Sequence, residues 1–453
     1  MKKYKAVFVW RFLTPNRGDL ASSPWNYLYF QKNVTTKIDI SHDLQSPKIL
    51  EILDDSEVII VGGGGLLGLK KYIDKIKFIV TNYSEKTVIW GAGSNWPRRD
   101  LPIELPSLQN CLFSGIRDFP LSATYAQYPE QTISGSTYLP CASSLDLYFL
   151  LYWKRQILGR NKQTSQKNRK RRLKVLFSFN DAGKQAQLFP SSFMKKVDML
   201  LSNDFDYSFS TIGNSNIRIH SCLDAIQSAD LIFTRSYHFA YWGLLLGKPV
   251  IAIPTSSKFN SFTSLYTNYL LFSSCSEVLD FLSSVNIPTF EEFIFKTTAL
   301  HNIHYYLQSL LLNLSAARNI YSQIGDVESY KMFSSKYYAL LELLPTKVFS
   351  DIGIDANTSC KSDACSSPFS KTSLTASEVD KLMTLYSGAS PLLADNAINQ
   401  SVEFSKIDLQ DYKCLALNNI QNSISDQVNC VMSFGLMHRI KRRLKIIVNM
   451  FLS

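Results

Sequence analysis

The sequence predicts an α/β protein made of two Rossmann-like domains, and three observations support this fold class. The 453 residues are 45% hydrophobic, which is more apolar chain than one ordinary core accommodates. Continuous apolar runs recur, as expected of strands that are covered on both faces of a parallel sheet. Helix-like segments alternate with these runs, and such alternation is typical of parallel α/β sheets.

The first domain is expected to span residues 1–153. Three strand-like runs lead into polar or glycine-rich turns there: Lys5–Trp10 before Thr14–Asp19, Ser56–Val61 before Gly62–Gly65, and Thr87–Trp90 before Gly91–Gly93. Turns of this kind at strand ends suit the connections from a parallel strand to a covering helix.

A second α/β domain is expected over residues 173–345. It begins with the apolar run Leu173–Phe179, and a helix followed by a strand is predicted over Asp224–Phe233 and again over Leu244–Ile253. Helices rich in Leu, Tyr and Phe follow from residue 290. Between the domains, residues 154–172 are predicted to form a basic linker, because the segment is polar and lacks aliphatic periodicity.

The C-terminal part is predicted to be a helical and irregular extension. Residues 346–436 are rich in Ser and Asn and are expected to be partly disordered. Residues 437–453 have basic residues and helical apolar spacing, which predicts a basic amphipathic helix. Such a helix suits an anionic membrane surface, and it equally suits packing on the protein body.

Charge and cysteine content exclude several classes of protein. The net charge of +11 is concentrated in residues 154–174 and in the C-terminal tail, so we expect no nucleic-acid partner. The eight cysteines include no CxxC pair, and no metal site is predicted. Neither a signal peptide nor a spanning helix is indicated, so a cytoplasmic location is expected, with possible peripheral binding to the inner face of the membrane.

The glycine-rich turn is the first candidate for ligand binding. Gly63, Gly64 and Gly65 follow a strand, where bare backbone amides can approach an anion or a hydroxylated ligand. A dinucleotide site is disfavoured because no acid ends the next strand, and no Walker loop is present. The alternative is that these glycines serve only tight packing of strand and helix.

His238 is the main catalytic candidate. It follows the predicted strand Leu231–Phe233 and lies near a helix start, where it could exchange a proton at neutral pH. The neighbouring Arg235 could bind a carboxylate or phosphate. A capping or packed histidine is the alternative. Further polar side chains follow other predicted strands and could converge on the same edge: Asn16, Asp19, Arg117 and Lys258.

These segments, in this order, resemble the polysaccharide pyruvyl transferase family. The resemblance covers about residues 5–265 and is carried by Asn16–Asp19, Val58–Leu67, Val88–Gly93, Gly115–Asp118, Leu139–Ser143, Ala229–His238, Ala240–Ile251 and Lys258. Many members carry arginine two residues before the histidine, and here Ser236 occupies that place while Arg235 lies one residue further away.

The resemblance implies a GT-B-like fold and transfer of an enolpyruvyl-derived group from phosphoenolpyruvate to a sugar hydroxyl, with no cofactor. His238 would then be the general acid. Substrate would be bound by Asn16, Asp19, Gly63, Gly64, Gly65, Arg117, Arg235, Ser236 and Lys258. The acceptor would be a surface polysaccharide or a lipid-linked glycan.

Two alternatives remain open on the sequence. One is a glycosyltransferase of the same architecture that uses a nucleotide sugar. The other is a non-catalytic protein associated with carbohydrate or membrane.

Overall fold

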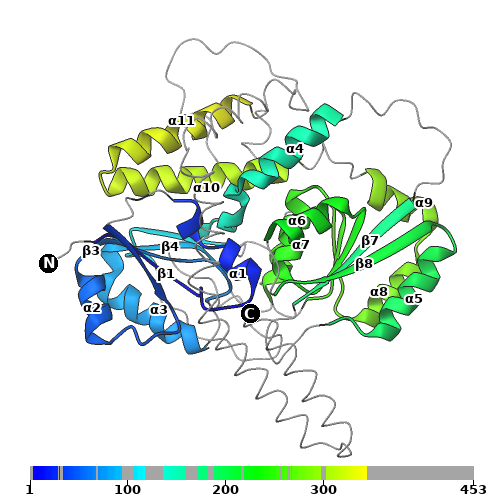
Figure 1. Cartoon of the computed structure of the whole chain (residues 1–453), viewed down its shortest axis with the longest axis horizontal. Coiled ribbons are helices and arrows are strands. Elements are labelled where there is room, and N and C mark those ends of the chain that lie inside the picture. The colour runs from blue at the N-terminus through cyan, green and yellow to red at the C-terminus, as the bar shows by residue number, and fades with distance from the viewer. Residues whose placement is uncertain are drawn as a thin grey trace, which may run out of the picture. The chain divides into compact units, whose positions relative to one another are not determined.

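The structure is a computed structural model that describes residues 4–28, 30, 34–67, 70–93, 107–117, 136–159, 172–180, 188–215, 219–254, 257–262, 266, 268–296 and 303–343. All of these residues lie in one compact unit, which spans residues 1–389. Within it the strands form two separate parallel sheets, each flanked by helices (Figure 1).

The N-terminal lobe is built on a six-stranded sheet in which every strand pairs in parallel with its neighbours. The strand order is β2-β1-β3-β4-β5-β6. The strands are β1 (Tyr4–Trp10), β2 (Thr35–Asp39), β3 (Ser56–Gly62), β4 (Thr87–Ala92), β5 (Phe113–Ile116) and β6 (Thr137–Tyr138).

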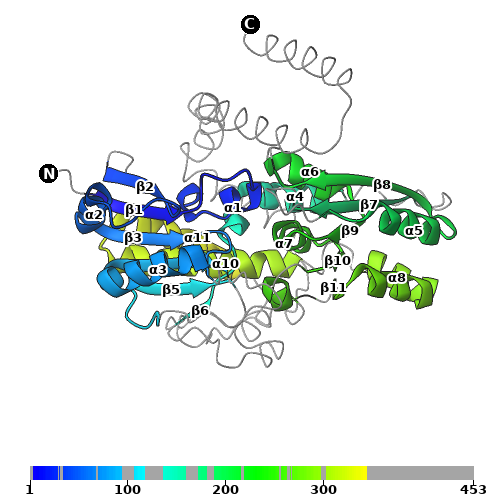
Figure 2. The same ribbon diagram turned by 90° about the horizontal axis from the view of Figure 1, so that it is seen from below.

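Alternate residues of these strands face two different layers of helices. Ile59 and its neighbours pack with the apolar sides of α2 (Pro47–Asp54) and α3 (Lys70–Tyr83). Ile60 and Trp90 face the opposite way, toward α4 (Leu147–Gly159), α10 (Ile303–Gln323) and α11 (Val327–Leu343). Figure 1 shows the sheet between these layers, and in Figure 2, seen from below, α3 lies in front of the sheet. Both faces are therefore buried, as the unbroken apolar strands predict.

The C-terminal lobe contains a five-stranded parallel sheet of order β11-β10-β9-β7-β8. Its strands are β7 (Arg172–Phe179), β8 (Asp206–Gly213), β9 (Leu231–Thr234), β10 (Val250–Ala252) and β11 (Tyr269–Leu271). One face is covered by α5 (Ser191–Ser202), α8 (Cys275–Ser284) and Phe290 of α9 (Ile287–Glu291), and the other by α6 (Ile219–Ser228) and α7 (Tyr237–Leu245). The predicted α/β fold of two Rossmann-like domains, each with a parallel sheet, is confirmed.

The linker prediction needs correction at its start. Helix α4 continues to Gly159, and β7 begins at Arg172. Residues 154–159 are therefore helical, because the apolar side chains of α4 carry the helix past the point where the basic residues begin. The remaining linker residues, 160–171, lie outside the described part of the chain.

The trailing helices also differ from the expectation, because they pack on the N-terminal lobe. The indole of Trp90 on β4 donates to Asn313 Oδ1 of α10 at 3.0 Å, and the Lys5 ammonium lies 2.7 Å from the Asp326 carboxylate. The apolar face of the first sheet needs cover, and α10 and α11 supply it. The domain predicted over residues 173–345 therefore needs correction at its end. Its last helices, α10 and α11, pack with the N-terminal lobe.

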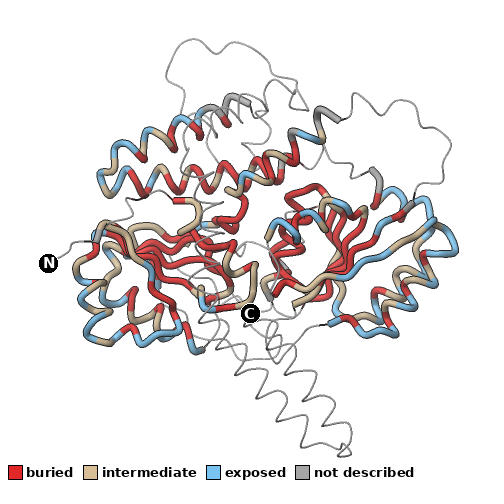
Figure 3. The backbone as a smooth tube through the Cα atoms, viewed as in Figure 1, coloured by how far each residue is buried: buried red, intermediate tan, exposed pale blue. Residues whose placement is uncertain are grey.

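Helix α7 connects the two lobes through buried contacts. Every residue from Tyr237 to Leu245 is buried, which Figure 3 shows as continuous red tube. The Trp242 indole donates to Ser143 Oγ at 3.1 Å, and the Trp153 indole donates to the Leu245 carbonyl at 3.0 Å. Because Ser143 and Trp153 follow the first sheet in the chain, α7 is held by elements of both halves.

Among the residues described, no helix combines the length and apolar content that crossing a membrane requires. The predicted extension 346–436 and the predicted basic helix 437–453 lie outside the described residues.

Candidate active site

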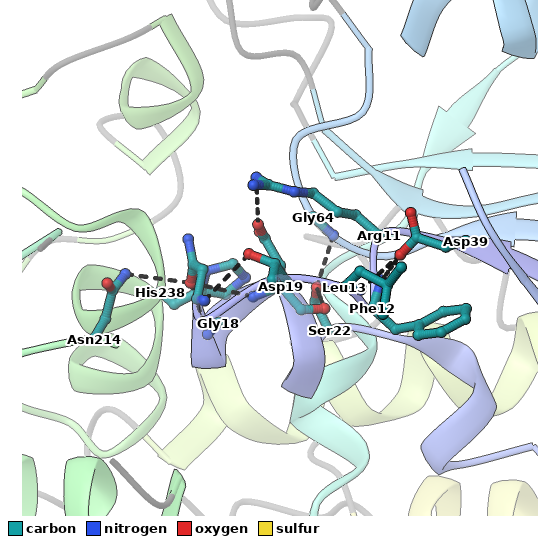
Figure 4. A network of polar contacts seen from close by, with 12 residues as sticks. Arg11, Phe12, Leu13, Gly18, Asp19, Ser22, Asp39, Gly64, Asn214 and His238 are labelled. Atoms are coloured by element: carbon teal, nitrogen blue, oxygen red, sulfur yellow. Dashed lines mark hydrogen bonds and ion pairs between the residues drawn. The ribbon is translucent and has the colours of Figure 1, made fainter. Parts of the chain in front are cut away.

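Asn16 lies in the turn after β1 and begins the short helix α1 (Arg17–Ala21). Its side-chain oxygen accepts hydrogen bonds from the amides of Gly18 at 2.9 Å and Asp19 at 3.4 Å, which is N-cap geometry. Asp19 points toward Arg11, with Oδ2 3.6 Å from the guanidinium (Figure 4). The predicted turn therefore positions a helix start at the carboxyl end of β1.

Asp39 fixes the chain that leads into this turn. It is fully buried at the end of β2, and its carboxylate accepts hydrogen bonds from the amides of Phe12 at 2.7 Å and Leu13 at 2.6 Å. Asp39 is thus a structural residue that holds the connection from β1 to α1.

The glycine turn after β3 packs against α1 rather than presenting free amides. Gly63 and Gly64 have φ values of +84° and +72°, which glycine adopts readily. The Gly64 amide donates to Ser22 Oγ at 2.7 Å, and the Gly63 amide donates to the Trp90 carbonyl at 3.3 Å. Both amides are therefore bonded within the protein, as the packing alternative expects, and the binding role of Gly63 and Gly64 stays a prediction. Gly65 is partly exposed.

Arg117 follows β5 and lies buried beside Gly93, with 2% of its surface exposed. A Cβ atom at residue 93 would overlap the guanidinium group, so only glycine leaves room for Arg117 there. Because the Arg117 amide donates to the Ala92 carbonyl at 3.1 Å, the backbone is also fixed at this strand end.

His238 lies in the first turn of α7 and faces the N-terminal lobe. Its imidazole is 4% exposed, and Arg117 Nη1 lies 3.4 Å from Nε2. A guanidinium can only donate, so Nε2 is the acceptor and the ring proton resides on Nδ1. The Nδ1 side lies against the backbone of Gly18, as Figure 4 shows. The structure thus brings together His238, Arg117 and the α1 turn, as predicted.

Burial and two cations determine the ionisation of His238. Desolvation lowers its pKa well below the usual 6.5, and the charges of Arg117 and Lys258 lower the pKa further. Lys258 lies in the 3₁₀ helix Ser257–Phe262, which follows β10. The site therefore holds a neutral imidazole under the influence of a cation from each lobe.

Asn214 is a residue of this site that the sequence analysis missed. It follows β8, is 1% exposed, and its amide nitrogen donates to Asn16 Oδ1 and to Ser236 Oγ, both at 3.3 Å. Its carbonyl accepts a hydrogen bond from the Arg17 amide at 2.9 Å. Asn214 thereby joins the caps of α1 and α7 across the two lobes. The signal for it was slight, a Gly-Asn pair at the end of a strand.

Arg235 does not join the other cations. Its Nη1 donates to the Leu188 carbonyl at 2.8 Å, and its charge acts on Cys275 of α8, on the other side of the sheet. Ser236 is buried at the N-cap of α7, where its hydroxyl accepts from Asn214. Successive residues of an extended strand end point to opposite faces, which explains why Arg235 and Ser236 diverge.

In this two-lobed α/β chain a buried histidine of one lobe meets an arginine of the other, which is the layout of an enzyme whose site lies where two lobes meet. The family model described as polysaccharide pyruvyl transferase matches residues 7–257, more than half of the sequence. The chain belongs to this family and is therefore a glycan-modifying transferase.

Solved structures resemble the chain only distantly, and no curated protein matches it. A glycotransferase of kitacinnamycin is 11% identical, covering 70% of this chain and 100% of its own, with a TM-score of 0.37. The wall teichoic acid polymerase TagF is 8% identical, covering 71% and 90%, with a TM-score of 0.36. The UDP-GlcNAc 2-epimerase of Neisseria meningitidis is 12% identical, covering 68% and 99%, with a TM-score of 0.38. The family assignment rests on the family model.

Proposed function

We propose that this transferase moves a pyruvyl group from phosphoenolpyruvate to two hydroxyls of one sugar in a surface polysaccharide or a lipid-linked glycan, forming a ketal. The observation that carries the proposal is the placement of His238 Nε2 3.4 Å from Arg117 Nη1, with the charge of Lys258 acting on the same ring. An acid–base group between two cations suits a substrate that carries both a carboxylate and a phosphate.

The reaction needs a proton donor at the donor substrate's methylene carbon. In the proposal His238 protonates this carbon, which builds positive charge on the adjacent carbon, and a sugar hydroxyl forms a C–O bond there. The bond from that carbon to the phosphate oxygen then breaks, inorganic phosphate leaves, and a second hydroxyl of the sugar closes the ketal. Two hydroxyl protons are released, one balancing the proton taken up by the methylene carbon and one carried away by the phosphate.

Arg117 and Lys258 are assigned to the anionic groups of the donor. Their charges would bind the carboxylate and phosphate and would stabilise the departing phosphate. Asn16, Asp19 and the partly exposed Gly65 lie at the strand ends of the N-terminal lobe and remain the proposed acceptor side. Because the Arg235 guanidinium bonds to Leu188, we assign no donor contact to it.

Donor binding would also ionise the histidine. A neutral imidazole cannot act as a strong acid, and burial together with the charges of Arg117 and Lys258 favours the neutral form of His238 in the free protein. A dianion placed between Arg117 and Lys258 offsets their charges, so the pKa of His238 rises and the ring gains the proton that the reaction consumes. The general acid is thus charged only when its substrate is present.

The test is phosphate release by the purified full chain. Incubation with phosphoenolpyruvate and the glycans made by the source cell should release phosphate and add a pyruvate ketal, and His238→Gln should abolish both. Protection against thermal unfolding by UDP or GDP sugars, together with no protection by phosphoenolpyruvate, would instead favour a nucleotide-sugar glycosyltransferase. Absence of release with every acceptor would contradict the proposal.

A further inference from the structure

The ring of Tyr237 contacts all three charged or titratable groups of the site. Tyr237 precedes His238 in α7 and is 3% exposed. The guanidinium carbon of Arg117 lies 4.1 Å from the centre of this ring, and Lys258 Nζ lies 5.7 Å from it. The imidazole of His238 meets the ring edge to face, with centroids 5.4 Å apart and planes at 89°. One aromatic side chain therefore adjoins a cation from each lobe and the proposed acid.

Other aromatic side chains hold this ring in place. Phe262 stacks on Tyr237 with centroids 4.9 Å apart and planes at 25°, and Tyr241 lies nearly parallel to it at 6.3 Å. Phe262 belongs to the same 3₁₀ helix as Lys258, and Tyr241 is one turn along α7. The ring is thus fixed by the same elements that carry Lys258 and His238.

We propose that Tyr237 is a positioning residue whose aromatic face holds Arg117 and Lys258 together as a paired binding site for a dianionic donor. This inference rests on the proposed function for the identity of the donor. The interaction is a cation–π attraction, which strengthens when the cation is desolvated, as the buried Arg117 is.

An aromatic ring beside Arg117 and Lys258 affects the binding of an anionic substrate differently from a carboxylate. A carboxylate would attract the same cations, but it would also cancel part of their charge and repel an incoming anion. An aromatic face attracts cations through its quadrupole and carries no net charge. It therefore counters the mutual repulsion of Arg117 and Lys258 and leaves their charges available to carboxylate and phosphate groups.

The first experiment compares Tyr237→Leu with Tyr237→Phe in the full chain. Leucine removes the aromatic face, so we expect KM for phosphoenolpyruvate to rise about tenfold or more with a smaller change in kcat. Phenylalanine keeps the face and should restore KM to within about threefold of the wild-type value. The matched control is Tyr269→Leu, because Tyr269 is similarly buried and also packs on Phe262, at 5.4 Å.

Tyr269→Leu should lower Tm about as much as Tyr237→Leu and leave KM unchanged. An equal rise in KM for both leucine variants, or no rise for Tyr237→Leu, would overturn the proposal.

A second readout needs no substrate. The proton NMR titration of the His238 ring, assigned with His238→Gln, reports the burial of the ring and the proximity of the two cations. If Tyr237 positions them, the pKa of His238 should rise in Tyr237→Leu and stay low in Tyr237→Phe and Tyr269→Leu. A rise in a protein that neither binds nor turns over phosphoenolpyruvate would support the positioning role and reject the proposed reaction. An unchanged pKa in Tyr237→Leu would reject the positioning role, whatever the wild-type activity.

Discussion

The backbone of Gly18 lies directly against the imidazole of His238, although the two residues belong to different lobes. Any side-chain carbon at residue 18 would overlap the Nδ1 side of the ring. Gly18 lies in α1, whose cap Asn16 is hydrogen-bonded to Asn214 of the other lobe. The position of the proposed acid is therefore set by the contact between the lobes as well as by its own helix.

Gly18→Ala should impair catalysis without destabilising α1. Alanine favours a helix over glycine, so the intrinsic propensity gains about 1 kcal/mol. The added methyl group collides with the ring of His238, which has 4% of its surface exposed and little room to move. We expect kcat to fall about a hundredfold, since small misplacement of a reacting group carries costs of this size. The fall in kcat is measured from steady-state phosphate release.

The control for that substitution is Gly325→Asn, in the turn between α10 and α11. Nothing lies within 4 Å of an added Cβ there, and asparagine tolerates the φ of +69° better than other residues. This variant should retain wild-type kcat. A Gly18→Ala enzyme as active as Gly325→Asn would show that the ring can move without loss.

Donor binding should take up a proton near neutral pH. The pKa of free His238 lies well below 6.5, and a bound dianion raises it, so the complex holds more protons than the free protein between the two values. In that window the affinity for phosphoenolpyruvate falls as pH rises, and below the free pKa this dependence disappears. Calorimetry in two buffers of different ionisation enthalpy measures the uptake directly.

Because the phosphate of the donor also titrates near neutral pH, His238→Gln serves as the reference. The difference in proton uptake between wild type and this variant isolates the imidazole. Equal uptake by the two proteins would mean that His238 does not change its charge on binding.

Strand-end placement was enough to predict much of this site from the sequence. Arg117 and His238 follow strands of different sheets, and the carboxyl ends of parallel strands gather such residues at one edge. Asn214 also lies at a strand end, but its role depends on a partner cap almost two hundred residues away in the chain, which no local pattern indicates. The positions of α10 and α11 were missed for a related reason, since apolar periodicity shows that a helix is buried but not which sheet it covers.

Arg235 shows a different limit of sequence reasoning. A guanidinium three residues before the histidine is close in the chain, yet the strand end turns it toward Leu188. Arg235→Ala should therefore change kcat/KM for the donor by less than about threefold, whereas Arg117→Ala should reduce it about a hundredfold or more. Arg117→Lys keeps the charge but loses the planar guanidinium group that can donate two parallel hydrogen bonds. Its kcat/KM should lie between the values of Arg235→Ala and Arg117→Ala. Kinetics at constant ionic strength would test the order, and a larger loss for Arg235→Ala than for Arg117→Ala would contradict the assignment.

Asn214→Ala tests whether the hydrogen bonds that join the two lobes are needed for catalysis as well as for stability. The change removes hydrogen bonds to Asn16 and Ser236, so we expect a loss of about 1–3 kcal/mol in stability and a fall of about tenfold in kcat. Asn268→Ala is the matched control, because Asn268 is also fully buried in the C-terminal lobe and donates to the Lys248 carbonyl at 2.7 Å.

Asn268 precedes β11, at the amino end of the sheet and away from the site. The Asn268→Ala variant should lose as much Tm as Asn214→Ala, and its kcat should stay near the wild-type value. Equal effects of both variants on kcat would show that the hydrogen bonds of Asn214 serve stability alone. A selective loss of kcat in Asn214→Ala would instead mean that the caps of α1 and α7 must be joined for His238 to reach its working position.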